Sequence, residues 1–521
     1  MIDVAVIGAG PNGLVAANLL ADAGLDVVVC EEQPEPGGAV RSGQLTLPGY
    51  VNDMFSAFYP FAVASPVIRQ LELERWGLRW RHAPLVVAHP TVEGPTAVLS
   101  RDLEETAASL DEFGAGDGET WKRLYRFWSR LEEPFMEALT TPFPPVLPGI
   151  KLAAELRVRG SAQLARIGLL SLRRFAQENF TGSGGALLLG GNALHADLTP
   201  EMPGSAFYGL VLCGIGQHLG YPVPEGGAGR LTDALVRRLQ ARGGAVHCDR
   251  RVQRILVDDG RATGVRLDDG EVLRARVAVL ADVGAPQLYE DLLDPADAPS
   301  RILRSLRRFQ YDNSTIKIDW ALERPVPWTS AQARRAGTVH VAESLELLSE
   351  TTNGLERQQI PARPFLIFGQ YSMADPSRAP EGAEAAWAYA HVPQRSRSDS
   401  AGELRGVWDE QELAIFVGRM EDEVERLAPG FKRLILARNV FGPRELERLD
   451  RNLVGGAING GTAKFHQQLV FRPVPGLGRP ETPIRGLYLA SASAHPGGGV
   501  HGAPGAIAAR ALLRKHVGRA R

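Results

Sequence analysis

Three glycines near the N-terminus have the spacing that binds a dinucleotide. Gly8, Gly10 and Gly13 form the pattern GxGxxG, with Pro11 and Asn12 inside it. In such a loop the first glycine allows a tight turn, the second lets the backbone approach a pyrophosphate, and the third lets a helix pack closely on a strand. The N-terminus of that helix offers free N–H groups to the phosphates. The pattern therefore predicts dinucleotide binding.

The elements needed to position this loop surround it in the right order. The segments 2–7 and 26–30 are short apolar runs typical of buried parallel strands, and 14–23 between them is helical in character. Glu31 ends the second run, where a carboxylate can accept hydrogen bonds from an adenosine ribose. Glu32 is the neighbouring candidate for the same contact. A βαβ unit without a ligand is the alternative, and the complete order of strand, glycines, helix, strand and acid argues against it.

A second glycine-rich segment favours FAD over NAD. Pro36-Gly37-Gly38 follows Glu31 closely, and Arg41 comes soon after. Two glycines at this place let the chain turn back over a bound dinucleotide. The segment resembles the extended fingerprint of the large FAD-dependent oxidoreductase superfamily, whose members often carry arginine directly after the glycine pair. Here Ala39 occupies that place, and we include Arg41, two residues later, among the predicted cofactor contacts.

The C-terminal region contains another strand, turn and helix pattern. An apolar strand is expected at 486–490, a glycine-rich turn at 491–500, and a helix of small residues from 502 to 513. The helix N-terminus favours a negative group, and the physics suggests the flavin edge where negative charge collects on reduction. The predicted cofactor contacts from this turn, together with the first residue of the strand expected at 252–257, are Ser491, Gly498, Gly499, Val500 and Val252.

The sequence has no strong catalytic motif, and a flavin dehydrogenase needs little more than a C–H bond placed over the flavin. His495 and His501 flank the C-terminal glycines and are candidates for a proton or charge partner, with simple packing of the loop as the alternative. Lys464 and His466 are candidates for the flavin face. We interpret His195-Ala196-Asp197 as a solvated loop pair, with an oriented base as the alternative. No spacing of His and Cys predicts a metal site.

Composition limits the partners, the cysteine chemistry and the location that we expect. The chain has 521 residues, 44% of them hydrophobic, and a net charge of −2, so nothing in the overall charge predicts nucleic-acid binding. The three cysteines form no CxxC pair, which argues against dithiol chemistry. The chain starts directly with a strand and has no apolar run of about 18 residues. We therefore expect no signal peptide, no membrane span and a cytoplasmic location, with peripheral membrane contact left open.

The predicted fold class is α/β, with a Rossmann-type FAD-binding domain built from the discontinuous segments 1–61, 221–286 and 451–521. A substrate-binding domain of α+β type, with a mixed or antiparallel sheet, is expected from 62–220 and 287–450. Residues 62–220 look helical and include an Arg-rich amphipathic stretch at 152–180, which is typical of surface helices, of a lid, or of a membrane-facing region. Alternation and β-branched content predict strands of the second domain at 314–320, 365–368 and 387–392.

Together these segments resemble the phytoene desaturase-like family of FAD-dependent oxidoreductases, and within it the branch of pyridine nucleotide-disulfide oxidoreductase domain-containing protein 2. The residues that carry the resemblance are 6–13, 36–38, 224–227, 471–473 and 486–505. The resemblance implies non-covalent FAD and the removal of hydride from a C–H bond, often in an apolar substrate. Carotenoid desaturases of this family are peripheral membrane enzymes.

We thus expect an FAD-dependent dehydrogenase or desaturase that transfers hydride from an apolar or isoprenoid-like small molecule to flavin N5. An amine oxidase-type flavoenzyme is one alternative, and a flavin-binding regulatory or scaffold protein with little turnover is another. The electron acceptor (oxygen, a quinone or NAD(P)), the oligomeric state and any acid or base stay open. A homo-oligomer and peripheral membrane contact are compatible with the sequence, and no nucleic-acid partner is expected.

Overall fold

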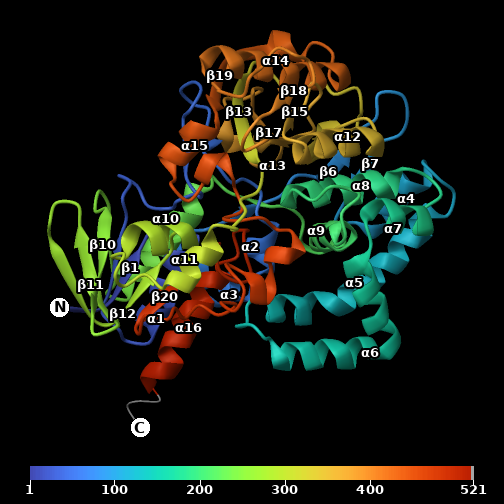
Figure 1. The fold of residues 1–521 in the computed structure, drawn as a ribbon. Helices are drawn as coiled ribbons and strands as arrows, with labels where there is room; N and C mark the ends of the chain where they lie inside the picture. Colours follow the sequence, from blue (N-terminus) through green and yellow to red (C-terminus); the bar gives the residue numbers. More distant parts are fainter. Residues whose placement is uncertain (518–521) are drawn as a thin grey trace.

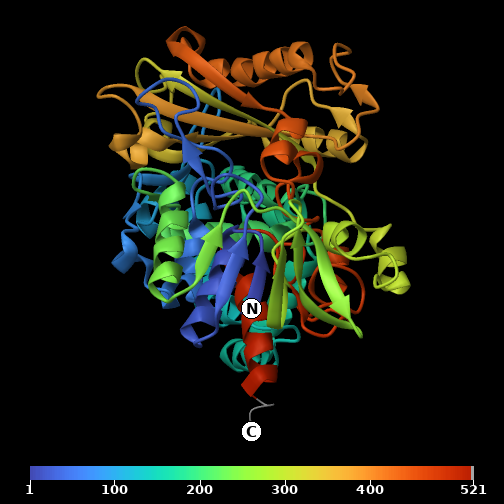
Figure 2. The same cartoon turned by 90° about the vertical axis from the view of Figure 1, so that its left-hand side faces the viewer.

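Two β-sheets and a group of helices form the part of the chain that the computed structural model describes, residues 1–517. In Figure 1 the first sheet lies below the second, and the helices between residues 103 and 219 lie beside them. The view turned by 90° shows the first sheet beneath the second as well (Figure 2).

The first sheet combines strands from three distant parts of the sequence. Its central strands pair in parallel in the order β12–β1–β2–β9, β20 pairs in parallel with β12, and an antiparallel extension runs from β12 through β11 to β10. A parallel strand covered on both faces is apolar throughout, as β1 is. The strands are β1 (Ile2–Ile7), β2 (Val27–Cys30), β9 (Ala245–His247), β10 (Val252–Asp258), β11 (Arg261–Leu267), β12 (Val272–Ala281) and β20 (Leu487–Leu489). The predicted α/β fold with a discontinuous Rossmann-type unit is confirmed.

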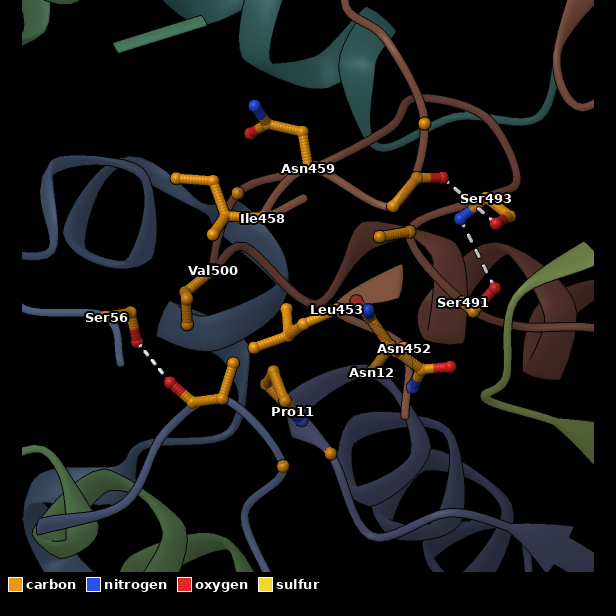
Figure 3. A pocket seen from close by; sticks show the side chains of 18 of the residues that line it. Pro11, Asn12, Ser56, Asn452, Leu453, Ile458, Asn459, Ser491, Ser493 and Val500 are labelled. Carbon is orange, nitrogen blue, oxygen red and sulfur yellow. Dashed lines mark hydrogen bonds between the residues drawn. The ribbon is translucent and has the colours of Figure 1, made fainter. Parts of the chain in front are cut away.

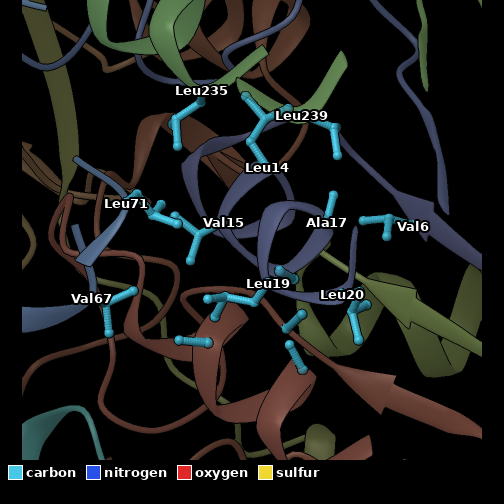
Figure 4. Packing of buried hydrophobic residues seen from close by; sticks show 14 of the residues in the cluster. Val6, Leu14, Val15, Ala17, Leu19, Leu20, Val67, Leu71, Leu235 and Leu239 are labelled. Carbon is cyan, nitrogen blue, oxygen red and sulfur yellow. The ribbon is translucent and has the colours of Figure 1, made fainter. Parts of the chain in front are cut away.

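Three helices pack around this sheet: α1 (Pro11–Asp22), α10 (Gly229–Ala241) and α16 (Ala503–Val517). Figure 4 shows Leu14 of α1 and Leu235 of α10 in one buried cluster with Val67 and Leu71. The segment that follows residue 61 therefore packs with the first sheet. The expected domain boundary at residue 61 thus lies inside this packing unit, because the apolar residues beyond it complete the same core.

The second sheet has the strand order β19–β13–β17–β16–β14–β6–β7. All its pairs are antiparallel except β14–β6, so it is a mixed sheet, as expected. Its strands are β6 (Leu85–His89), β7 (Ala97–Leu99), β13 (Ser314–Leu322), β14 (Ala336–Val341), β16 (Leu366–Gln370), β17 (Glu384–Val392) and β19 (Ile435–Phe441). The expectation of a helical region from 62 to 220 is wrong for β6 and β7, because short apolar runs do not reveal a distant pairing partner such as β14.

A group of helices lies between residues 103 and 219, beside the two sheets. Along α5, Trp121, Leu124, Trp128 and Leu131 are buried, which is the apolar stripe that helical spacing predicts. By contrast α6 is mostly exposed and is interrupted at Arg157, whose backbone is not helical. The helices of this group are α4 (Leu103–Asp111), α5 (Asp117–Leu139), α6 (Val146–Leu169), α7 (Leu172–Asn179), α8 (Gly184–Ala193) and α9 (Ser205–Leu219).

The remaining helices and strands connect these units or cover the outer face of the second sheet. On that face α14 buries Phe416, Met420 and Val424 against Trp320 and Phe368. Of the helices within residues 1–517, none is both long and apolar enough to cross a membrane. The other elements are α2 (Pro60–Ala64), α3 (Pro66–Gln70), α11 (Ser300–Leu306), α12 (Leu345–Glu356), α13 (Tyr371–Ala374), α14 (Glu410–Leu427), α15 (Pro443–Leu449), β3 (Ser42–Gly43), β4 (Asn52–Asp53), β5 (Trp80–Arg81), β8 (Val223–Pro224), β15 (Gln359–Ile360) and β18 (Ser398–Asp399).

Candidate functional site

A cavity of about 1100 Å³ extends from the first sheet to the second. Figure 3 shows Pro11, Asn452 and Val500, which come from three distant segments, around one part of it. The predicted site residues that line the cavity are Gly8, Gly10, Pro11, Asn12, Glu31, Glu32, Gly38, Val252, Ser491, His495, Gly498, Gly499, Val500 and His501. Among the described residues, Gly13, Gly37, Arg41, Lys464 and His466 are not part of the lining.

The GxGxxG loop packs against an aspartate that sequence reasoning missed. A Cβ atom on Gly8 would lie 2.9 Å from the Asp282 carbonyl oxygen, and one on Gly10 would lie 2.8 Å from Asp282 Oδ2. The N–H of Gly13 donates to the same carboxylate at 2.8 Å, and a Cβ on Gly13 would collide with Gly8. Burial raises the pKa of Asp282 to about 8. Its position directly after strand β12 was the available signal, since ligands bind at the carboxyl ends of parallel strands.

Glu31 is buried at the cavity and holds the neighbouring loop in place. Its Oε2 accepts from the N–H of Ala9 at 2.7 Å, and its Oε1 accepts from the N–H of Gln33 at 2.9 Å. Burial raises the pKa of Glu31, and these two donors oppose the shift. Glu32 is less constrained, since its carboxylate lies 3.8 Å from Arg251 and 3.6 Å from Arg451. The ribose contact assigned to Glu31 stays a prediction.

The second glycine pair packs on the first loop. The N–H of Gly37 donates to the Ala9 carbonyl at 2.8 Å, and a Cβ on Gly38 would lie 3.1 Å from the Cα of Gly10. Arg41 is turned away from the lining, because its guanidinium donates to the carbonyl oxygens of Gly38 at 3.0 Å and Leu449 at 2.8 Å. Arg41 therefore connects the second glycine pair to the end of α15.

The C-terminal turn brings two histidines to the cavity. The backbone N–H of Ala503 donates to Nδ1 of His501 at 3.1 Å, so this ring caps the start of α16. Both ring nitrogens of His495 are buried without a hydrogen-bond partner among residues 1–517. Burial lowers the pKa of each histidine to about 4, so both are uncharged near neutral pH. A chemical role for either ring stays a prediction.

The structure does not bring Lys464 and His466 to the cavity. Nζ of Lys464 forms an ion pair with Glu356 at 2.6 Å, and Nε2 of His466 lies 2.9 Å from Oε1 of Gln310. Phe465 between them does line the cavity. Of residues 464–467, which end in the short helical turn Phe465–Gln467, only the partly exposed Phe465 lines the cavity, and loop composition does not reveal this.

Two further cations of the cavity wall were not predicted. Arg472 is fully buried, and its guanidinium donates to backbone carbonyl oxygens of Asn459, Thr462 and Ala492 at 3.1, 3.0 and 2.6 Å. The ion pairs among residues 1–517 include none to Arg472, so its charge has no direct carboxylate partner. Lys317 on β13 is also buried, and its Nζ lies 2.6 Å from both carboxylate oxygens of Asp319. The polar residues at alternate positions of an otherwise apolar strand were the signal for Lys317.

The cavity end beside the first sheet fits a dinucleotide. No side chain caps the start of α1, and its first turn contains no acidic residue, which leaves a favourable electrostatic site for phosphate. Oδ1 of Asn12 is buried there without a partner among the described residues. A buried polar atom without a partner is costly unless a ligand or water satisfies it. Together with the ring of His495, whose nitrogens have no hydrogen-bond partner among the described residues, these features provide polar groups that bound FAD could satisfy.

Comparison with known proteins agrees with this geometry. The model of an NAD(P)-binding Rossmann-like domain matches residues 6–71, and that of a flavin containing amine oxidoreductase matches residues 94–400.

Curated relatives match over nearly the whole chain, and two of them serve as examples. Pyridine nucleotide-disulfide oxidoreductase domain-containing protein 2 of Mus musculus is 29% identical and covers 98% of this chain and 93% of its own. Phytoene desaturase (lycopene-forming) of Pseudescherichia vulneris is 25% identical and covers 98% of both chains. The crystal structure of an oxidoreductase from Methanosarcina mazei aligns with a TM-score of 0.64 at 17% identity, covering 98% of this chain and 100% of its own.

Proposed function

Because the chain belongs to the flavin containing amine oxidoreductase family and is an FAD-dependent oxidoreductase, we propose that it oxidises a C–H bond of an apolar small molecule in the cavity. The observation that carries the proposal is the continuity of the cavity, which runs from the dinucleotide loop to an apolar chamber. A ligand in that chamber shares one enclosed space with the cofactor site.

The walls of the chamber are built to hold apolar groups. Its lining comes from α5, α6 and α9, through Phe135, Leu139, Leu152, Leu164, Phe207 and Val211. Burial of apolar surface contributes about 25 cal/mol per Å², so these walls can bind a hydrocarbon chain without directional contacts. They also exclude water from the reacting bond, which strengthens electrostatic effects inside the cavity.

The charges in the cavity argue against a cationic amine as the substrate. Among the described residues, the carboxylates that line it are Glu31, Glu32, Asp282, Asp291 and Asp450. All of them belong to segments around the first sheet, and none lies on the helices of the apolar chamber. Asp319 of the second sheet is buried outside the cavity lining, and its charge is paired with that of Lys317. An ammonium group in the chamber would lack the counter-charge that a buried cation requires.

Bound FAD would supply a two-electron acceptor, and the protein supplies placement and charge. Gly8, Gly10 and the start of α1 would hold the pyrophosphate, and Glu31 would hold the adenosine ribose. Arg472 holds the loops around residues 459–462 and 492 together, and its uncompensated charge favours negative charge in the cavity. In the cavity wall, Nζ of Lys317 donates to the carboxylate of Asp319.

Anaerobic mixing of the holoenzyme with compounds of equal chain length tests the proposal. The panel is dec-1-ene, decan-1-ol, decan-2-one, decanoate and decylamine, and the readout is loss of the flavin absorbance. We expect neutral compounds to reduce the flavin and decylamine to leave it oxidised. Reduction by decylamine alone would instead establish the amine oxidase alternative. Reoxidation of the reduced protein by oxygen, a quinone or NAD(P) then identifies the electron acceptor.

We also propose that the protein takes its substrate from a lipid surface. Val146, Leu147 and Ile150 at the start of α6 are exposed, as are Phe465 and Leu469. In Figure 1 α6 lies at the edge of the molecule, away from both sheets. Phe465 and Leu469 themselves line the cavity, and α6 contributes further lining residues. Exposed apolar side chains next to residues that line a cavity are typical of proteins that bind at a membrane interface.

Vesicle binding tests this second proposal. The double variant Leu147→Ser/Ile150→Ser removes two exposed apolar side chains, each worth roughly 1.5–3 kcal/mol when fully buried. We expect at least a tenfold loss of affinity for phosphatidylcholine–phosphatidylglycerol vesicles in a flotation assay. Val272→Ser, which alters an exposed apolar residue on the distant strand β12, is the matched control. Equal vesicle binding of parent and double variant would contradict the proposal.

A further inference from the structure

A row of side chains crosses the second sheet toward the cavity. His340 on β14 pairs with Ile367 on β16, Ile367 pairs with Tyr389 on β17, and Tyr389 pairs with Lys317 on β13. Directly paired residues point to the same face of a sheet. Ile367, Tyr389 and Lys317 line the cavity, so this face forms its wall, and the buried His340 continues the same row.

His195 lies over His340 and reaches the cavity. It belongs to the short turn Leu194–Ala196 that follows α8, and its Nε2 lies 2.9 Å from Nε2 of His340. The interpretation of His195 and Asp197 as a solvated pair is wrong, because Asp197 accepts instead from the backbone and side chain of Asn313. His195 lines the cavity, and its Nδ1 has no hydrogen bond to another described residue.

The surroundings of His340 determine which ring donates. Nδ1 of His340 is fully buried and has no hydrogen-bond partner among residues 1–517. A Cβ atom added to Gly191 would collide with this nitrogen, so a Cα hydrogen of Gly191 points at it. A lone pair accepts a C–H hydrogen favourably, whereas an N–H in that position would face another hydrogen and lack an acceptor. Nδ1 of His340 is therefore unprotonated, and its Nε2–H donates to His195.

The tautomer of His195 follows from that of His340. Because Nε2 of His195 accepts a hydrogen bond, the neutral ring carries its hydrogen on Nδ1. Burial lowers the pKa of His195 to about 3, so the ring is neutral near pH 7. His195 lines the cavity, and no described residue accepts a hydrogen bond from its Nδ1–H. A donor held in this way needs an acceptor from the ligand.

We propose that His195, oriented by His340, donates a hydrogen bond from Nδ1 to a neutral oxygen of the substrate. This inference rests on the proposed function and names its substrate class, an apolar molecule that carries one carbonyl or hydroxyl group. Such an oxygen would fix which carbon of a long, otherwise featureless chain lies over the cofactor. A donor of this kind favours ligands that carry the acceptor over analogues that lack it.

The nearby charges favour a neutral oxygen over a carboxylate. The charge of Lys317 is compensated by Asp319. The hydroxyl of Tyr221 donates to the Asn192 amide oxygen at 2.6 Å or to the Leu212 carbonyl oxygen at 3.1 Å. His391, on the strand β17, has Nδ1 3.4 Å from the carbonyl oxygen of Ser314. The groups that face His195 thus provide no net positive charge for an anion, whose burial without a partner is costly.

Ligand affinity of the holoenzyme tests the proposal separately from turnover. We would measure binding of decan-2-one and dec-1-ene by calorimetry, because only the ketone offers an acceptor. His195→Phe should weaken binding of the ketone roughly three- to tenfold, the size of one hydrogen bond, and leave the alkene within about twofold. His195→Gln keeps an N–H donor and should restore part of the ketone affinity. His247→Phe, on the exposed end of β9, is the control and should change neither.

His340 is a positioning residue, and its variant needs a different readout. In His340→Phe the ring of His195 is free to present either a donor or an acceptor. Binding of decan-2-one, which only accepts, should then weaken more than binding of decan-1-ol, which both donates and accepts. A purely structural role for His340 would weaken both ligands equally and would contradict the proposal.

The outcomes separate this inference from the function on which it rests. If His195→Phe weakens the ketone and the alkene together, or weakens neither, the assigned hydrogen bond is refuted. If the ketone alone weakens while no compound of the panel reduces the flavin, the binding role of His195 stands and the proposed oxidation fails. Both results are obtained with the model compounds alone, whatever the natural substrate is.

Discussion

Glu31→Gln tests the cofactor site most directly. The Glu31 carboxylate accepts from Ala9, in the middle of the phosphate-binding loop, and from Gln33. Glutamine keeps one oxygen and places an amide N–H₂ at the other position. One of the two backbone N–H groups therefore loses its acceptor and faces another donor.

The expected magnitude follows from the hydrogen bond that is lost. A hydrogen bond to a charged group contributes about 1.5–3 kcal/mol, which corresponds to roughly a 10- to 150-fold change in an equilibrium constant. Because the loop must regain its order when FAD binds, we expect the dissociation constant for FAD to rise by this factor. Loss of a ribose contact would add to the effect in Glu31→Ala.

Titration of apoprotein with FAD, followed by quenching of flavin fluorescence, measures this constant. Glu32→Gln is the matched control, because the Glu32 carboxylate makes only ion-pair contacts of 3.6 and 3.8 Å with Arg451 and Arg251. A partly exposed pair of this kind is worth about 1 kcal/mol or less, or roughly fivefold. A larger loss in Glu32→Gln than in Glu31→Gln would refute the assignment of Glu31 to the cofactor site.

Three further predictions concern the same site. Burial raises the pKa of Asp282 from 3.8 to about 8, so the folded apoprotein keeps a proton that the unfolded chain loses. Its free energy of unfolding should fall as pH rises through this window, and Asp282→Asn should flatten the fall in urea titrations. Gly499→Val should lose flavin or lower its reduction potential, because Gly499 has a φ of +109° at the cavity; full occupancy and an unchanged potential would contradict this. Acid precipitation should release FAD into the supernatant, since no cysteine lies in the turn 491–500, and colour that stays in the pellet would show a covalent link.

The sequence by itself determined the cofactor fold and indicated many of the residues that line the cavity beside the first sheet. Gly8, Gly10, Glu31, Gly498 and Gly499 all line the cavity. The glycines among them are predictable because a positive φ or a close backbone approach restricts the residue type locally. The order of strand, turn and helix can likewise be predicted from the short-range periodicity of apolar residues. The family resemblance rests on the same local segments.

The tertiary structure decided which side chains meet at the substrate end. Lys464 turns outward to Glu356 while the adjacent Phe465 lines the cavity, and His195 meets His340 from a distant strand. These outcomes depend on strand register and on the direction of single side chains, since a shift of one residue reverses the face that a side chain occupies. Contacts between residues far apart in the chain set that register, and no local pattern of residue types encodes them.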